Sequence, residues 1–271
     1  MGLIKISGDY SDLLTVFPLP KTLLKSILPK DVYDGLLPVP ANYGLRADEH
    51  LVMLHLGRQK TGPPFYRFNA QEAKVEIPFI APPFSSSREK AVPSVYKHSL
   101  WTDSLLLATS ARMTMGLRTE KAVFDPPNAP GDAGSLRSLT DGAVEAKYEV
   151  KGKVSWFGRK DKWQGELYAQ EKETVSTAGI WWFGEYAGGS LCQFPMTAKR
   201  ENVPYKATIR LHLPSIQLGS SPLPASPALR ENYRIEGEWL VLQGVTTWWN
   251  DASWELNGPH KAAEVEKQLA K

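Results

Sequence analysis

Apolar and polar residues alternate along much of this chain, and a period of two predicts β-strands. In the first half, the pattern predicts strands over residues 49–59, 65–80 and 95–103. The second of these strands places three charged residues on one face, Glu72, Lys74 and Glu76, and apolar residues on the other. The charged face is either a solvated edge or one wall of a cavity, and the alternation alone leaves both readings open.

The second half of the chain has the same alternating character. Strands are expected over five runs, at residues 142–158, 163–175, 179–186, 205–218 and 237–249. Helical spacing is confined to three short segments, at residues 20–28, 104–114 and 261–271. Many strands with few short helices predict an α+β fold that is mainly antiparallel β, with curved sheets or a barrel enclosing a central cavity.

Composition is that of an ordinary globular protein. The 271 residues are enough for a core and an enclosed cavity, and we expect a single domain over 1–271, with a possible internal loop boundary near 124–135. The 32 basic and 29 acidic residues are spread along the chain, so no nucleic-acid partner is expected. The single cysteine, the lack of a signal-peptide pattern and the lack of a long apolar run predict a cytoplasmic protein that binds no membrane.

The motifs of most cofactor-dependent enzymes are absent from the sequence. There is no GxGxxG, P-loop, HExxH, CxxC or GxSxG pattern, and the five histidines are scattered. We therefore expect no metal and no cofactor. Nine tryptophans are a high count, and they favour a deep aromatic core or an aromatic-lined pocket. The remaining chemistry would come from carboxylates, Arg, Lys, Thr and aromatic side chains.

Several short motifs recur in a recognisable order over residues 10–125. The run LWTDSLLLATSAR ends a strand, carries Asp103 and leads into a short helix with Arg112, and MGLRTEKA follows. Upstream, Glu72 lies five residues before Ile77-Pro78, and LLKSILPKDV forms an early helix ending in a Leu-Pro turn. In this order and spacing the chain resembles the acetoacetate decarboxylase superfamily.

The resemblance implies an enzyme that forms a Schiff base through one lysine, with a second lysine beside it to lower the first one's pKa. Register from Asp103 and Arg112 places Thr119 at the Schiff-base position and Glu120 at its neighbour. A threonine cannot form an imine, so the resemblance implies a retained scaffold without this chemistry. A loop shift of two residues would instead bring Lys121 into the slot.

Three functions follow from this reading. The first is a cofactor-independent cyclase or isomerase of specialised metabolism, which holds a bulky hydrophobic carbonyl compound, such as a polyketide or terpenoid, in a reactive conformation. The second is a Schiff-base decarboxylase, hydratase or aldolase-type lyase that uses Lys121. The third is a non-catalytic carrier of hydrophobic ligands. Any of these would take a small hydrophobic molecule as its partner, and a homo-oligomer is possible.

The candidate site residues follow from the resemblance and from the aromatic pattern. With the resemblance, Glu72 is read as a cavity residue, and Glu76 is not. Candidate catalytic residues are Glu72, Arg118, Thr119, Glu120 and Lys121. Candidate substrate-binding residues are Arg112, Met115, Leu117, Trp101, Trp182, Tyr186 and Trp248. For Arg112 the alternative is an ion pair that pins its helix, for Arg118 and Glu120 an exposed turn, and for each tryptophan a place in the core.

Overall fold

The computed structural model describes ten segments of the chain. These are residues 6–43, 45–62, 67–125, 135–138, 144–149, 181–186, 188–199, 203–212, 233–237 and 239–270. The strand expected over 163–175 lies outside them, as does most of the loop expected at 124–135. No helix among the described residues is long and apolar enough to span a membrane.

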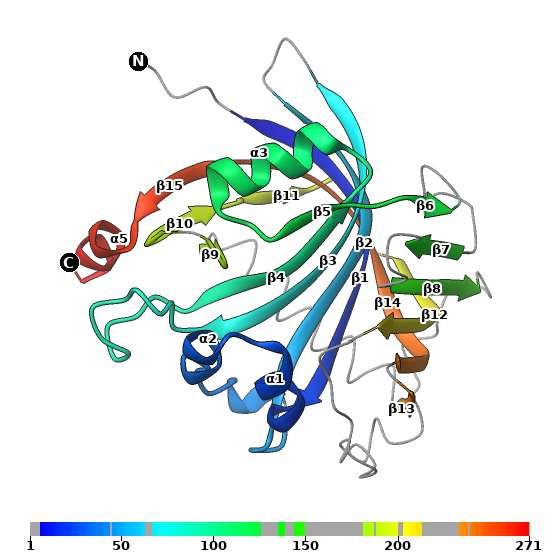
Figure 1. Cartoon of the computed structure of the whole chain (residues 1–271), viewed down its shortest axis with the longest axis horizontal. Coiled ribbons are helices and arrows are strands. Elements are labelled where there is room, and N and C mark those ends of the chain that lie inside the picture. Colours follow the sequence, from blue (N-terminus) through cyan, green and yellow to red (C-terminus); the bar gives the residue numbers. More distant parts are fainter. Residues whose placement is uncertain are drawn as a thin grey trace.

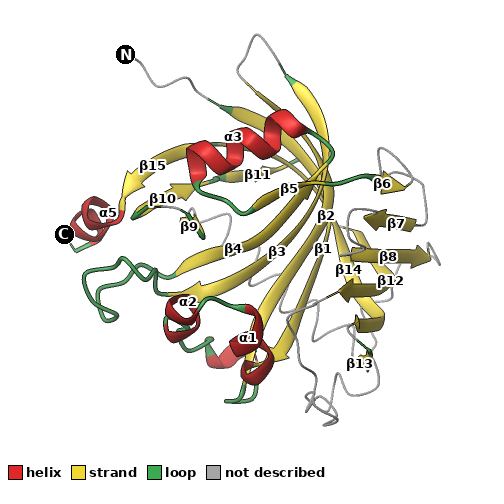
Figure 2. Cartoon of the chain, in the orientation of Figure 1, coloured by secondary structure: helices red, strands yellow, loops and turns green. Residues whose placement is uncertain are grey.

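Four long strands form the centre of one curved sheet (Figure 1). They pair antiparallel in chain order and are β1 (Ser7–Pro20), β2 (Glu49–Gly62), β3 (Phe68–Ile80) and β4 (Ser94–Thr102). The expected strands of the first half are therefore confirmed, while β1 is a strand that the pattern did not indicate. Figure 2 shows that strands dominate the described structure. The prediction of a mainly antiparallel α+β fold with a curved sheet is confirmed.

The sheet continues on both sides of these four strands. Beyond β1 come β14 (Trp239–Glu255), β12 (Val203–His212), β8 (Val144–Glu149), β7 (Ser135–Ser138) and β6 (Phe124–Asp125). Two further strands pair with β14, namely β11 (Met196–Ala198) and β13 (Tyr233–Glu236). On the other side, β4 pairs in parallel with β5 (Thr119–Lys121) and β9 (Trp181–Gly184), and β10 (Ser190–Gln193) and β15 (Asn257–Lys261) follow β9.

The described helices are short, and all but α5, which follows β15, lie near the ends of the central strands. They are α1 (Lys21–Ile27), α2 (Lys30–Asp34), the 3₁₀ turn Ala41–Tyr43, α3 (Leu105–Met115) and α5 (Ala262–Leu269). Figure 1 shows α3 at one end of β1–β4 and α1 with α2 at the other. Both ends of α3 have defined caps. The Ser104 side chain accepts a hydrogen bond from the Leu107 amide, and Gly116 ends the helix in the left-handed conformation, at φ 63°.

The two faces of the central strands are both buried but differ in chemistry. One face packs into a large apolar cluster that includes Phe17, Val52 and Ile77. The other face is apolar towards α1, where Leu14 and Met53 pack. Towards α3 the same face becomes charged, and its charged members are Asp12, His55, Glu72, Lys74, Glu76 and Lys97. The charged face of β3 is therefore an interior surface, and the reading of Glu76 as a solvated residue is wrong because the side chain has no exposed area.

A bulge in β4 decides which of its side chains share this charged face. Lys97 pairs with Glu76 and Leu100 pairs with Lys74, so two residues of β4, His98 and Ser99, lie opposite the single residue Val75 of β3. The extra residue, His98, lets Lys97 and Leu100 lie on the same face. Without the bulge, simple alternation would put Trp101 on the same face as Lys97.

Candidate active site

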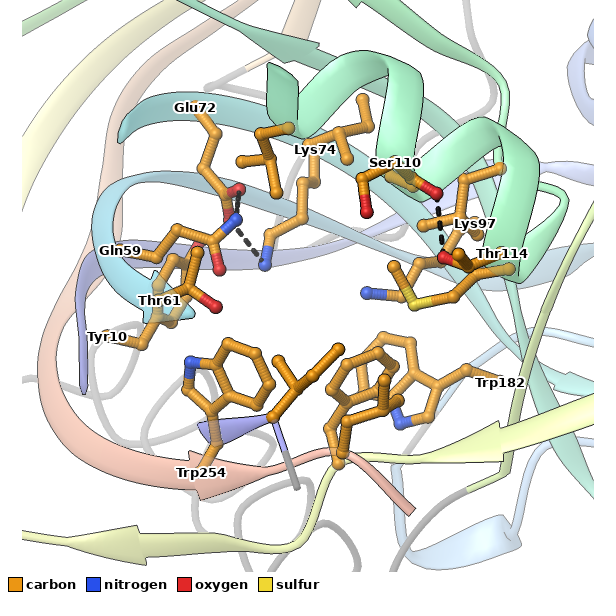
Figure 3. Close-up of a pocket in the computed structure, with 18 of the residues that line it drawn as sticks. Tyr10, Gln59, Thr61, Glu72, Lys74, Lys97, Ser110, Thr114, Trp182 and Trp254 are labelled. Atoms are coloured by element: carbon orange, nitrogen blue, oxygen red, sulfur yellow. Dashed lines mark hydrogen bonds and ion pairs between the residues drawn. The ribbon is translucent and has the colours of Figure 1, made fainter. Parts of the chain in front are cut away.

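A cavity of about 290 Å³ lies between the charged face of the sheet and α3. This volume is at the lower end of the range for small-molecule sites. Its wall is mostly apolar and aromatic, and its charged groups lie on β2 to β4. In Figure 3, Lys74 and Lys97 extend into the cavity, and Trp254 and Trp182 form the wall facing them. The polar and aromatic lining residues on or facing the sheet include Tyr10, His55, Gln59, Glu72, Lys74, Lys97, Trp182, Phe194 and Trp254.

Lys74 belongs to a tight ion pair on β3. Its Nζ lies 2.8 Å from Oε1 of Glu72, two residues earlier on the same face. The other oxygen of Glu72 accepts a hydrogen bond of 2.5 Å from the Gln59 side chain. Burial lowers the pKa of Lys74, but the nearby Glu72 and Glu76 carboxylates outweigh it and raise the pKa above its ordinary value. Lys74 is therefore held as an ammonium ion, which also lies 4.0 Å from the centre of the Tyr10 ring.

Lys97 has a looser partner and a drier environment. Its Nζ lies 3.3 Å from Oε1 of Glu76, and 4.2 Å and 4.7 Å from the ring centres of Trp182 and Phe194. The ring faces attract an ammonium ion weakly, but they also exclude water. Burial lowers the pKa of Lys97, the attraction of Glu76 offsets this only in part, and the neighbouring Lys74 lowers it further. Lys97 is therefore the buried amine in this cavity that loses its proton more easily.

Glu76 is shared between Lys97 and a histidine on β2. Nε2 of His55 lies 3.2 Å from Oε2 of Glu76, and Nδ1 of His55 lies 2.6 Å from Oδ2 of Asp12. Burial lowers the pKa of His55, but Glu76 and Asp12 outweigh it and raise the pKa to about 9. Burial also raises the pKa of Glu76, but Lys97 and His55 outweigh it, so the carboxylate stays ionised. His55 is thus an imidazolium between two carboxylates.

Two glycines leave room for these side chains. Gly57 lies directly opposite Asp12, and a Cβ atom at this position would lie 2.5 Å from the Cβ of Asp12. Gly8 lies opposite Trp254, and a Cβ atom there would lie 2.8 Å from the indole ring. A side chain at either position would displace the group it faces, because real Cβ contacts are not this short.

Four of the twelve residues singled out from the sequence line the cavity. Glu72 lies on β3, Met115 and Leu117 lie at the end of α3 and just beyond it, and Trp182 lies on β9. The aromatic pair in β9 divides between the two faces of the sheet. Trp182 faces the cavity, while Trp181 packs against the large apolar cluster.

The turn after α3 lies outside the cavity wall. Arg118 and Glu120 are about half exposed and face each other at 3.7 Å, and Lys121 is exposed. Thr119 is buried, but its hydroxyl donates to the Leu117 carbonyl rather than lining the cavity. Because β5 pairs in parallel with β4, this segment is held as an edge strand beside the cavity. The structure thus places Lys121 away from the cavity, at an exposed position on β5.

The other four predicted binding residues do not line the cavity. Arg112 is exposed and its guanidinium lies 5.5 Å from the ring centre of Tyr186, which is also exposed. Trp101 packs against the large apolar cluster because the β4 bulge turns it to that face. Trp248 faces the cavity side of β14 but is buried in the apolar cluster near Leu14.

Sequence reasoning missed most of the charged groups of the site. Lys97, His55, Asp12, Lys74 and Glu76 were not predicted as site residues. One signal was available, because Lys74 lies between Glu72 and Glu76 on the face from which Glu72 was chosen. For Lys97 the signal was hidden by the bulge that sets the facing of β4.

Comparisons with known proteins agree with this fold. No family model matches the sequence, and no curated protein matches it significantly. Among solved structures, the enduracididine biosynthesis enzyme MppR, complexed with the condensation product of pyruvate and imidazole 4-carboxaldehyde, superposes with a TM-score of 0.54. The match has 10% identity and covers 97% of this chain and 90% of MppR. Acetoacetate decarboxylase from Legionella pneumophila superposes with a TM-score of 0.52, at 12% identity, over 94% of this chain and 88% of that one.

These likenesses establish the class of fold. The chain has an acetoacetate decarboxylase-like fold, as the order of its motifs indicated. A second MppR structure, complexed with pyruvate, covers 97% of this chain and 91% of its own at 11% identity, with a TM-score of 0.50. At this identity the likeness defines the scaffold only, so the chemistry has to be argued from the cavity itself.

Proposed function

We propose that this chain is an enzyme that binds a small, neutral, mostly apolar carbonyl compound and activates it by forming an imine with Lys97. The observation that carries the proposal is the amine of Lys97, buried against Trp182 and Phe194 with a lowered pKa, in a cavity with an apolar wall. A buried lysine whose ammonium form is disfavoured is the kind of amine that attacks a carbonyl carbon near neutral pH. This replaces Lys121 as the reacting lysine of the Schiff-base alternative.

The choice between the two cavity lysines rests on their partners. Lys74 is held by Glu72 at 2.8 Å and its pKa is raised, so it keeps its proton and its charge. Lys97 contacts Glu76 at 3.3 Å and its pKa is lowered. Lys74 then acts on Lys97 as the second cationic group, and it disfavours a further positive charge nearby.

The proposed reaction begins with a condensation in which atoms balance. The neutral amine of Lys97 attacks the carbonyl carbon, and the nitrogen gives up one proton as the oxygen takes one up, which gives a carbinolamine. The hydroxyl group then leaves with the second nitrogen proton as one water molecule, and the neutral imine remains. Two lining groups suit these steps. Burial and the nearby Glu72 raise the pKa of Tyr10, so its hydroxyl stays protonated and can donate a hydrogen bond to the developing alkoxide. Glu72 itself is the carboxylate that can accept a proton from the bound compound.

The charge balance of the cavity favours a neutral substrate. Its described cationic lining groups are His55, Lys74 and Lys97, and each already lies beside a carboxylate. No arginine is among the described lining residues. A substrate carboxylate would therefore lack a free cation and would face Glu72 in a dry site. We infer a hydration, dehydration or aldol-type step on an uncharged carbonyl compound rather than a decarboxylation.

The solved structures of similar fold support a carbonyl ligand. MppR has been solved with pyruvate, which is a carbonyl compound, and with the condensation product of pyruvate and imidazole 4-carboxaldehyde. Pyruvate carries a carboxylate, whereas each described cation that lines the present cavity already lies beside a carboxylate of the protein. We therefore infer a substrate that has a carbonyl group but no carboxylate.

Reductive trapping tests the proposal. The full chain is incubated with a panel of neutral ketones and aldehydes and sodium cyanoborohydride, and the adduct is located by peptide mass spectrometry. We expect a stable secondary amine on Lys97 in the wild type, no adduct at this peptide in Lys97→Met, and an unchanged yield in Lys121→Met. An adduct that forms only outside the cavity would overturn the proposal.

A second candidate keeps the cyclase function without an imine. The aromatic wall of Trp182, Phe194 and Trp254 favours it, because such a wall holds an extended apolar substrate in one conformation. In that case a Lys97→Met variant retains turnover of a polyene or polyketide carbonyl substrate, and no adduct is trapped. A carrier would bind the same compounds tightly, with no product formed by wild type or variant.

A further inference from the structure

Four side chains, one from each central strand, form a row of alternating charge beneath the cavity. Asp12 lies on β1, His55 on β2, Glu76 on β3 and Lys97 on β4. Their successive contacts measure 2.6 Å, 3.2 Å and 3.3 Å. Glu76 and Lys97 are direct cross-strand neighbours, whereas the other two contacts join diagonal positions. The row is an internal chain of ion pairs that ends at the amine of Lys97.

Glu76 is the member of the row that lies between two cations, His55 and Lys97. One of its oxygens lies near His55 and the other near Lys97, and neither has an aligned hydrogen-bond donor among the described residues. The side chain has no exposed area, so water does not screen it. A carboxylate in this position interacts with both cations at once, and the repulsion between the two cations reduces the net stabilisation of each protonated form.

The second lysine of the cavity offers a comparison within the same site. Glu72 also contacts a lysine through one oxygen, but its other oxygen accepts a hydrogen bond from Gln59, which is neutral. Glu72, which lies beside the neutral amide, pairs with Lys74, and the pKa of this lysine is raised. Glu76, which lies beside the imidazolium, pairs with Lys97, and the pKa of this lysine is lowered. The two arrangements differ in the group on the far side of the carboxylate, in the distance from lysine to carboxylate, and in the aromatic rings around Lys97.

We propose that His55 is a positioning residue that keeps Lys97 reactive, because its positive charge, held in place by Asp12, occupies the Glu76 carboxylate that would otherwise hold Lys97 as an ammonium ion. The inference rests on the proposed function for its purpose, but the charge relation exists without any substrate. It assigns a role to His55 and Asp12, two buried polar groups that the imine step itself does not use.

One further carboxylate, Glu72, also favours the ammonium form of Lys97, but it is paired with Lys74. From β3 the charges of Glu72, Lys74 and Glu76 act on Lys97, and His55 on β2 contacts Glu76. Trp182 of β9 and Phe194 present ring faces, and burial raises the pKa of the Cys192 thiol on β10 to about 11, so that it stays neutral. Among the described residues, Asp12 and Tyr10 on β1 complete the titratable groups of this face.

The test measures the titration of Lys97 itself, without substrate. The full chain is acetylated with isotope-coded acetic anhydride at a series of pH values, and the rate at each lysine is read by peptide mass spectrometry. We expect His55→Gln to move the midpoint of Lys97 upward by about one pH unit or more, which is a tenfold slower reaction near neutral pH. Lys74 serves as the internal control, and its midpoint is expected to move less.

A second variant, expected to shift the Lys97 midpoint in the opposite direction, keeps the test decisive if His55→Gln fails to fold. Glu76→Gln removes the carboxylate and is expected to lower the midpoint of Lys97, so that it reacts faster at neutral pH. A purely structural role for His55 would change the melting temperature and leave the Lys97 midpoint in place. An unchanged or lowered midpoint in folded His55→Gln, or an unchanged or raised one in folded Glu76→Gln, would overturn the inference. Because no imine is needed, this result is separate from the trapping experiment.

Discussion

Lys97 on β4 lies directly opposite Glu76 on β3, with Nζ 3.3 Å from Oε1, and both side chains are buried at the wall of the cavity. The pair is looser than that of Lys74 and Glu72, at 2.8 Å on the same face. The tighter contact goes with a lysine of raised pKa, and the looser contact goes with a lysine of lowered pKa.

The two cavity lysines are expected to differ in what they contribute to stability. Lys97→Met removes the looser of the two ion pairs and leaves His55 beside the Glu76 carboxylate, so it should cost less than about 1.5 kcal/mol. Lys74→Met leaves the buried Glu72 carboxylate without its close cation and should cost about 3–5 kcal/mol. Urea unfolding followed by circular dichroism compares the two. Equal losses would contradict the assignment of charge.

A buried histidine on the other face of β2 should make the fold sensitive to acid. Burial lowers the pKa of His50 to about 4, although its Nε2 lies 2.7 Å from the Pro78 carbonyl oxygen. The unfolded chain binds this proton near pH 6.5, so the stability is fully present above that pH and is lost as the pH falls towards 4. The loss from this group approaches about 3 kcal/mol.

His50→Gln is the variant that isolates this contribution, because an amide side chain can still donate to the Pro78 carbonyl. We expect the free energy of unfolding of the wild type to fall more steeply between pH 6.5 and 4 than that of the variant. Burial also lowers the pKa of His98, so part of the slope remains. Parallel pH profiles for the two proteins would show that His50 is not buried in its neutral form.

The turn after α3 is expected to be dispensable for chemistry. Lys121 is exposed, and Arg118 and Glu120 form a half-exposed pair at 3.7 Å, which contributes little to stability. Lys121→Met and Arg118→Ala should therefore leave trapping yield and turnover within about twofold of wild type. Steady-state kinetics on any compound that Lys97 traps provides the measurement. Loss of activity in Lys121→Met would return the Schiff-base role to this lysine.

Much of the scaffold could be predicted from the sequence. The apolar alternation of β2 and β3 identified both strands, and the short motifs around Asp103 and Arg112 indicated the correct fold. Asp103 supports that fold by a contact between strand ends, because its side chain accepts a hydrogen bond from the Gln71 amide and its own amide donates to the Gln71 carbonyl. The strand periodicity and the short motifs are local in sequence, and local patterns report them well.

The charged interior was harder to predict for a physical reason. Periodicity assigns charged residues to solvent, and here charged residues on four strands face inward because they neutralise one another across the sheet. The strand β1 was missed for the same reason, since Tyr10 and Asp12 share a face with Leu14. The β4 bulge then reversed the facing of Trp101, and such a bulge depends on how β4 pairs with β3 rather than on its own sequence.

Oxygen exchange at a carbonyl group tests the central claim most directly. A neutral ketone labelled with ¹⁸O at its carbonyl is incubated with the full chain in ordinary water, and the label is followed by mass spectrometry. Imine formation at Lys97 expels the carbonyl oxygen as water, so the account predicts that wild type accelerates loss of ¹⁸O and that Lys97→Met does not. Retention of the label by wild type, with a ketone that it binds, would contradict an imine mechanism.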